Sequence, residues 1–324
     1  MSYYFMFVIL FFVGAYFEDA YKKKELPHFF KASGVLALAA VVGVCINISN
    51  LYHTYEYSKE TMRGKSELKQ EGAAASQTSS GLDRDYITNW SYGIGETLTL
   101  LVPNVKGGGS GSTMSQSEVA MAKANPMYNG IYSQLPQYFG EQPWTAGPVY
   151  VGAFVMFLFV LGCFIVKGPL KWALLGATIF SILLSWGKNF MGLTDFFIDY
   201  VPMYNKFRAV SSILVIAEFT IPLLAIFALK EILSKPDMLK QEKNCRGVIA
   251  ALVLTAGVAL ILAVAPGTFF SSFITAQEMT ALKQALPAEH LAPFVANLTE
   301  MREAIIASDA WRSFFVIMLS LIHI

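Results

Sequence analysis

The sequence has 324 residues, of which 55% are hydrophobic and only 15% are charged, and its mean hydropathy is +0.48. Soluble domains rarely reach this balance, so the composition favours an integral membrane protein. The formal net charge of +1 argues against a polyelectrolyte partner, and we expect no binding to nucleic acid. The three cysteines and four histidines show no metal-ligand spacing, so we expect neither a disulfide framework nor a zinc site.

Long apolar runs predict an all-α, polytopic helical membrane protein, because about 20 residues at 1.5 Å rise cross about 30 Å of hydrocarbon. About seven spans are expected, near 3–17, 34–51, 148–166, 171–187, 209–229, 247–265 and 311–324. The first and last runs are shorter than a full span, so we expect an internal fragment of a larger protein. The expected organisation is two spans in 1–51, a large outer loop at 52–147, four spans in 148–265, a second loop at 266–310 and a truncated span at 311–324.

The lysine and arginine residues predict the orientation of these spans. They concentrate in the short loops at 18–33, 167–171 and 230–246, which we therefore expect on the cytoplasmic side. The loops near 52–147, 188–208 and 266–310 are then extracytoplasmic. The first of them is expected to contain short helices and a flexible stretch, KGGGSGSTMSQS.

One outer loop has the pattern of an amphipathic helix at 193–201. Its apolar residues recur at helical spacing, and they are Leu193, Phe196, Phe197, Tyr200 and Val201. Asp195 and Asp199 lie four residues apart on another face, and both are candidate substrate-binding residues. We expect this helix to lie in the outer membrane interface, with Phe196 and Phe197 buried.

Charged residues at the mouth and centre of the fifth apolar run are the first candidate substrate-binding residues. Glu218 is expected near the middle of the span, where it is hydrogen-bonded to a polar neighbour, faces a wet cavity or is protonated. Lys206 and Arg208 precede the span at its outer end, and Lys188 begins the same loop. These basic residues suit a lipid phosphate or pyrophosphate, while snorkelling or pairing with Asp195 and Asp199 are the structural alternatives. On one continuous helix, Arg208 and Glu218 are expected to line one groove.

Two further charged clusters lie in the long outer loop. Glu56, Lys59 and Arg63 are candidate substrate-binding residues, and the alternative is a solvated helical extension of the preceding span. The pair Asp83 and Asp85 in LDRDY resembles an Asp-x-Asp motif that bridges a divalent cation to a pyrophosphate. Nothing else completes an oxygen-ligand shell, so no cofactor is assigned and a divalent cation stays open.

Four stretches carry a resemblance to a known family: NLYHTYEYSKETMRGKSEL, DRDYITNWSYGIGETLTLLVPN, GPVYVGA and SWGKNFMGLTDFFIDYVPMYNKFRAVSSILVIAEFTIPLLA. Together they resemble the YfhO-type multi-spanning membrane proteins of Bacteroidetes-like bacteria, which are similar to the GT-C glycosyltransferase superfamily. The resemblance implies the bacterial cytoplasmic (inner) membrane, an outward-facing site, and a polyprenyl-phosphate-linked sugar as donor in envelope glycan modification. The superfamily's catalytic acidic residue follows the first span, so it is expected upstream of Met1 and maps onto no residue here.

Three functions therefore remain open. The first is a GT-C-like glycosyltransferase, with membrane lipids and a polyprenyl-phosphate-linked sugar as partners. The second is a flippase or transporter of a lipid-linked solute, with Glu218 in its path, although the sequence shows no internal repeat of the kind that transporters carry. The third is a non-enzymatic envelope assembly protein.

Overall fold

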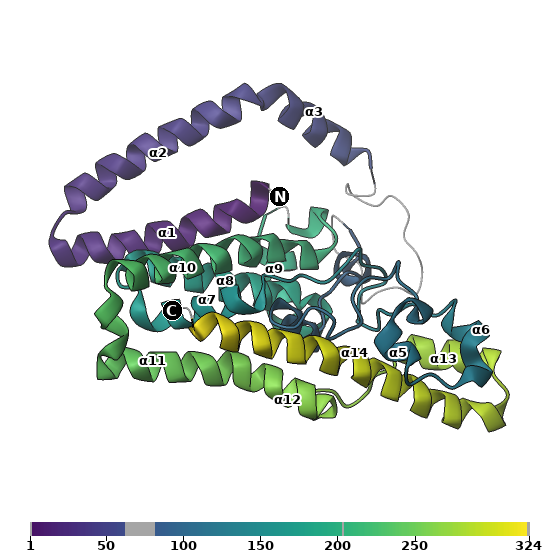
Figure 1. Cartoon of the computed structure of the whole chain (residues 1–324). Helices are drawn as coiled ribbons and strands as arrows, with labels where there is room; N and C mark the ends of the chain where they lie inside the picture. The colour runs from purple at the N-terminus through teal and green to yellow at the C-terminus, as the bar shows by residue number, and fades with distance from the viewer. Residues whose placement is uncertain (1, 62–81, 203, 323–324) are drawn as a thin grey trace. The chain divides into compact units, whose positions relative to one another are not determined.

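The computed structural model describes residues 2–61, 82–202 and 204–322. Within these ranges the secondary structure is helical and contains no strand, since the β pairing consists of one isolated bridge between Thr113 and Pro136. The prediction of an all-α protein is confirmed, and Figure 1 shows the helices in chain order.

Fewer helices than expected are long and apolar enough to cross a membrane. Within the described residues, four helical stretches meet this condition: Leu26–Ile46, Val210–Ser234, Glu242–Val264 and Ala288–Ile322. A fifth is obtained if Pro169–Ser185 and Gly187–Tyr200, which meet at a bend of 107°, form one broken span. Four or five such helices are consistent with a multi-pass membrane protein, but they are fewer than the seven or so spans that the sequence predicted.

The chain divides into two compact units. The first comprises residues 1–91 and 167–217, and the second comprises residues 92–166 and 218–324. The first contains α1 (Ser2–Lys23), α2 (Leu26–Ile46), α3 (Ile48–Lys59), α4 (Arg84–Thr88), α8 (Pro169–Ser185), η4 (Gly187–Phe190), α9 (Met191–Tyr200), η5 (Tyr204–Lys206) and η6 (Val210–Leu214). Helix α10 (Val215–Ser234) begins in the first unit and continues in the second.

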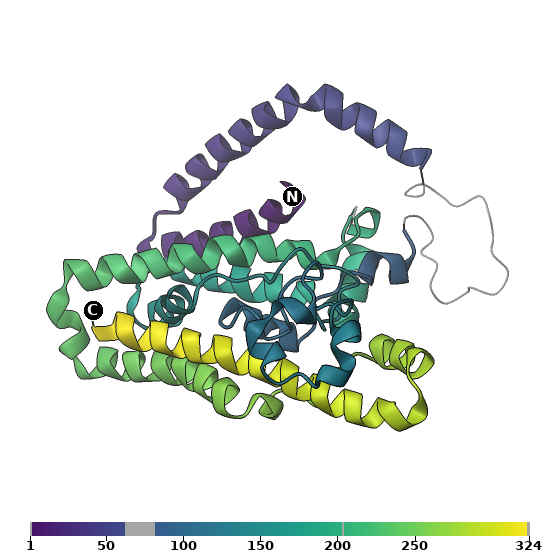
Figure 2. The same cartoon turned by 45° about the vertical axis from the view of Figure 1, so that its right-hand side comes forward.

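The second unit combines short helices with long apolar ones. The short ones are η1 (Gly95–Leu100), η2 (Met114–Gln116), α5 (Glu118–Met121), η3 (Pro126–Tyr128), α6 (Asn129–Tyr132), η7 (Pro236–Lys240), η9 (Pro266–Thr268) and α13 (Ala276–Ala285). The apolar ones are α7 (Ala153–Ile165), α11 (Glu242–Leu252), the π-helix η8 (Val253–Gly257), α12 (Val258–Val264) and α14 (Ala288–Ile322). The π-helix η8 and helix α12 pack along α14, and α11 packs against α7 (Figures 1 and 2).

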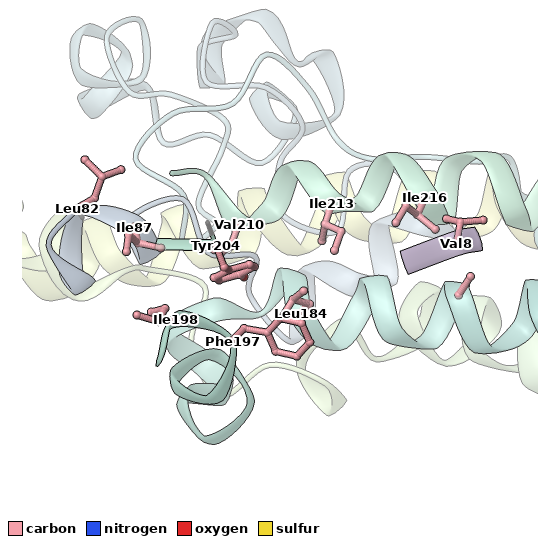
Figure 3. Close-up of a cluster of buried hydrophobic side chains, with 11 residues drawn as sticks. Val8, Leu82, Ile87, Leu184, Phe197, Ile198, Tyr204, Val210, Ile213 and Ile216 are labelled. Atoms are coloured by element: carbon pink, nitrogen blue, oxygen red, sulfur yellow. The ribbon is translucent and has the colours of Figure 1, made fainter. Parts of the chain in front are cut away.

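The core of the first unit is a cluster of buried apolar side chains between α8, α9 and the segment that leads into α10. Figure 3 shows Leu184, Phe197 and Ile213 within it. Helix α1 packs along α8, where Gly176 allows close approach because an added Cβ would lie 2.9 Å from the ring of Phe11. This core fixes α9 against the end of α8.

Helix α9 confirms the predicted helix within one or two residues but corrects its buried face. The described side chains at Thr194, Phe197 and Ile198 are buried, whereas Phe196 is 53% exposed. Both faces of this short helix carry apolar residues, so periodicity alone does not decide which one packs inward. The expectation that Phe196 is buried was wrong, and that for Phe197 was right.

The start of the fifth apolar run also differs from the expectation of one continuous α-helix. Ala209 has a left-handed backbone with φ of 63°, residues 210–214 form a 3₁₀ helix, and the α-helix begins only at Val215. The two ends of this stretch do not follow α-helical spacing. The argument that Arg208 and Glu218 line one groove through helical periodicity is therefore wrong.

Candidate functional site

Helix α4 is the element around which the predicted basic and acidic residues gather. It begins at an N-cap, Asp83, whose Oδ1 accepts hydrogen bonds from the backbone N–H groups of Asp85 (2.9 Å) and Tyr86 (3.4 Å). A side-chain oxygen in this role satisfies helix N–H groups that have no intrahelical partner. The carboxylate of Asp83 caps a helix, which gives the Asp-x-Asp pattern a structural explanation.

Arg84 is the partner of the acidic pair on α9. Its guanidinium donates to Oδ1 of Asp195 through Nη1 and to Oδ1 of Asp199 through Nη2, the latter at 2.6 Å. The planar guanidinium fork suits two carboxylates one helical turn apart. Hydrogen bonding to Asp199, partly opposed by burial, raises the pKa of Arg84.

The sequence proposed Lys206 or Arg208 as the structural partner of Asp195 and Asp199, and the structure replaces them with Arg84. Spacing on α9 correctly placed the two carboxylates on one face. It could not select Arg84, because that residue comes from a distant part of the chain and stands between two aspartates of its own in LDRDY. Local charge pattern suggested a different role for that stretch.

Arg208 contacts the α4 region through aromatic side chains and not through an ion pair. Its guanidinium carbon is 5.5 Å from the ring centroid of Tyr86 and 5.6 Å from that of Trp90. Its Nη1 donates a hydrogen bond of 2.6 Å to the hydroxyl of Tyr86. The side chain is exposed, and none of the carboxylates in residues 82–202 and 204–322 forms an ion pair with it. Tyr86 and Trp90 therefore fix the position of the Arg208 guanidinium, and they leave its positive charge without a carboxylate partner within residues 82–202 and 204–322.

Backbone hydrogen bonds at Lys188 and at Asn205, the residue before Lys206, tie both lysine-bearing stretches to residues 82–91. The N–H of Lys188 donates to the hydroxyl of Ser91 at 2.8 Å. Gly187, with φ of 47°, makes this approach possible, since an added Cβ would lie 2.1 Å from that hydroxyl oxygen. Lys206 follows Asn205, whose carbonyl accepts from the N–H of Leu82 at 2.9 Å. The residues 82–91 thus organise the stretches that carry Lys188, Lys206 and Arg208.

Glu218 lies on the surface of the described structure. Its side chain is exposed, which does not agree with a carboxyl buried against a neighbouring helix, whereas a position facing a wet cavity stays a prediction. It occupies the first turn of α10, where the helix dipole favours a carboxylate. The late start of the α-helix explains why a residue expected at mid-span lies at a helix beginning.

The second charged cluster is a local pair on α3. Lys59 forms an ion pair of 2.7 Å with Glu56, and each side chain is 47% exposed. Such exposed pairs contribute little to stability, and the arrangement agrees with a solvated helical extension. Arg63, the third candidate, lies outside the described residues.

The second unit contains a buried polar cluster that sequence reasoning missed. Glu96, on η1, is only 2% exposed, and its Oε1 accepts a hydrogen bond of 2.5 Å from the hydroxyl of Tyr138. Burial raises the pKa values of Glu96 and Tyr138, and it lowers that of the neighbouring Lys106. A single glutamate in an apolar-looking motif, YGIGETLTLLVPN, gave no charge pattern from which the cluster could be predicted.

Comparisons with protein-family models, with curated proteins and with solved structures find no match to this chain. Within the described residues, no group of three or more histidine, cysteine, aspartate or glutamate side chains is placed to hold a metal ion. The candidate sites are therefore two clusters of polar side chains, one around α4 and α9 in the first unit and one around Glu96 in the second unit.

Proposed function

We propose that this protein is a GT-C-like glycosyltransferase of a bacterial cytoplasmic membrane, and that Arg208 binds the phosphate of a polyprenyl-phosphate-linked sugar. The observation that carries the proposal is the exposed Arg208 guanidinium, held by Tyr86 and Trp90 without a carboxylate partner among the described residues. Arg84 meanwhile occupies both nearby carboxylates, Asp195 and Asp199. An arginine that breaks no ion pair on binding is suited to accept a phosphate in bidentate geometry.

The proposal includes the seven-span topology and the position of α9. The seven spans are the four apolar stretches of sufficient length together with α1, the 13-residue helix α7 and α8. The bend of 107° after Ser185 supports an α9 that lies along the outer interface once α8 crosses the bilayer. The exposed rings of Phe196 and Tyr200 support the same placement, since aromatic side chains favour the interface.

The flippase hypothesis requires Glu218 in a solute path, and the exposure of this side chain gives it no support. The assembly-protein hypothesis makes no demand on Arg208. A measurement of lipid phosphate binding through Arg208 therefore distinguishes the enzyme hypothesis from the assembly-protein hypothesis more directly than any other measurement on these residues.

The test is binding of a polyprenyl monophosphate to the purified protein in nanodiscs of neutral lipid, measured by native mass spectrometry. Arg208→Ala is expected to weaken binding about tenfold or more, because a hydrogen bond to a charged group contributes about 1.5–3 kcal/mol. Arg208→Lys should restore binding only in part, since the fork is lost. The polyprenyl alcohol of the same chain length, which has no phosphate, should bind equally to the wild type and to Arg208→Ala.

Arg246 provides the matched control, because it is an exposed arginine already paired with Glu242 at 2.5 Å. Arg246→Ala should leave polyprenyl phosphate binding unchanged. If Arg208→Ala and Arg246→Ala bind the lipid phosphate equally well, Arg208 has no phosphate role and the proposal fails.

A further inference from the structure

The segment around helix α4 holds the stretch that carries Arg208 at two points. Before α4, the backbone N–H of Leu82 donates a hydrogen bond of 2.9 Å to the carbonyl of Asn205. After α4, the carbonyl of Trp90 accepts one of 3.1 Å from the N–H of Ser211. Arg208 lies midway between these two backbone contacts. A change in the orientation of α4 therefore reaches Arg208 through the backbone as well as through the rings that contact its side chain.

Apolar side chains and one arginine hold α4 itself. Leu82 and Ile87 lie in the buried core of the first unit (Figure 3). Arg84, whose side chain is only 24% exposed, forms ion pairs with Asp195 and Asp199 of α9. A helix of five residues has little stability of its own, so these contacts set its position. The apolar pair keeps α4 on the unit, and the two carboxylates restrict its rotation because they hold one guanidinium from two points.

Tyr86 is placed to transmit a rotation of α4 to Arg208. It follows Arg84 by two residues on α4, and its hydroxyl accepts the hydrogen bond of 2.6 Å from Nη1 of Arg208. Its ring centroid lies 5.5 Å from the guanidinium carbon. A hydrogen bond weakens steeply when its angle departs from the preferred range. A rotation of α4 would therefore loosen the contact that fixes the guanidinium.

We propose that Arg84 is a positioning residue for Arg208. By bonding both carboxylates of α9 it sets the orientation of α4, and through Tyr86 it holds the Arg208 guanidinium in the geometry that binds phosphate. The inference rests on the proposed function for the identity of the ligand, but the contacts that lead from Arg84 to Arg208 do not depend on that ligand.

A purely electrostatic role for Arg84 predicts a different result from a positioning role. Arg84→Lys keeps the positive charge but loses the planar fork, because an ammonium group acts as a point charge. If only the charge mattered, Arg84→Lys would behave as the wild type does. In a positioning role Arg84→Lys loses function, since a single ammonium cannot hold α4 against two carboxylates with the same geometry.

The first measurement needs no lipid ligand. Fluorine nuclear magnetic resonance of the fluorotyrosine-labelled protein in nanodiscs reports the surroundings of Tyr86, whose signal is the one that disappears in Tyr86→Phe. Arg208→Ala gives the position of this signal without the guanidinium. Arg84→Lys and Asp199→Ala, which disturb the same contact from its two sides, should both move the Tyr86 signal toward that position. The control Arg246→Lys changes an exposed arginine elsewhere and should leave the signal in place.

The second measurement is binding of polyprenyl monophosphate, by native mass spectrometry in nanodiscs of neutral lipid. Arg84→Lys should weaken binding about fivefold, within the range of coupling between residues of one hydrogen-bond network. In the Arg208→Ala background the same change should alter binding by less than about twofold, because a residue that acts through Arg208 has no effect once that side chain is absent.

Three results would overturn the inference: a Tyr86 signal that stays in place in Arg84→Lys and Asp199→Ala, an equal loss of binding from Arg84→Lys with and without Arg208, or wild-type binding by Arg84→Lys where Arg208→Ala binds weakly. A Tyr86 signal that moves as expected, together with polyprenyl phosphate binding that Arg208→Ala leaves unchanged, would support the positioning role while the proposed function fails.

Discussion

At the scale of single residues, Lys106 couples stability to pH. Burial is the largest cause of its lowered pKa, Arg302 acts in the same direction, and Glu96 and Glu141 oppose it. The unfolded chain therefore holds this proton more tightly than the folded one, so the contribution of Lys106 to stability rises with pH between its folded pKa and the ordinary value of 10.5. Glu96 has the opposite sign, because a raised pKa means that stability is lost as pH rises above about 4.5.

Lys106→Met removes this proton linkage while keeping a side chain of similar length. We expect the difference in thermal midpoint, variant minus wild type, to fall as the pH rises toward 10.5, because only the wild type gains stability from losing the lysine proton. Thermal unfolding in detergent between pH 7 and pH 10.5 measures this difference, with Lys123→Met as the exposed control. A difference that stays constant or grows over this range would contradict the assigned direction.

At the scale of elements, α9 offers two adjacent phenylalanines in opposite environments. Phe197 is 7% exposed and its ring lies 5.8 Å from that of Phe7, 5.6 Å from that of Phe180 and 5.5 Å from that of Tyr204. Phe196 is 53% exposed and contacts Tyr200 on the surface. The packing of α9 on the first unit therefore depends on Phe197.

Phe197→Ala is expected to lower the free energy of unfolding by about 3 kcal/mol, because it leaves a cavity in an aromatic core. Phe196→Ala should lower it by less than about 1 kcal/mol, as is usual for surface positions. Denaturant unfolding of each variant in the same detergent measures the two losses. Equal losses, or a larger one for Phe196→Ala, would show that the other face of α9 packs inward.

Periodicity was sufficient to predict α9 as a helix, but the features that set its surroundings were not local. The choice between the Phe196 and Phe197 faces depends on the aromatic residues of α1 and α8, which the spacing within 193–201 does not contain. The break at Ala209 likewise has no glycine or proline to mark it. Arg84 and Lys106 acquire their roles from partners far along the chain, and this is why the candidate site was predicted only in part.

At the scale of the whole molecule, composition predicted the helical class, and the apolar runs predicted several membrane-crossing helices. The number of spans is more difficult to predict, because α7 has only 13 residues and covers about 20 Å at 1.5 Å per residue. Residues before Ala153 must add to it if it crosses the bilayer. The side of the membrane on which each loop lies is predicted from the distribution of lysine and arginine alone.

The loop at 230–246 contains a native reporter of sidedness, the exposed Cys245. We expect this loop on the cytoplasmic side because basic residues concentrate there. In intact cells expressing a Cys45→Ser, Cys163→Ser variant, a membrane-impermeant maleimide should leave Cys245 unlabelled, and permeabilisation should expose it. In the variant that also lacks Cys245, Ser115→Cys should be labelled without permeabilisation, since Ser115 is exposed in the expected outer loop. Labelling of Cys245 from outside, with Ser115→Cys protected, would invert the topology and place Arg208 on the cytoplasmic side, where a donor site facing the cell exterior has no place.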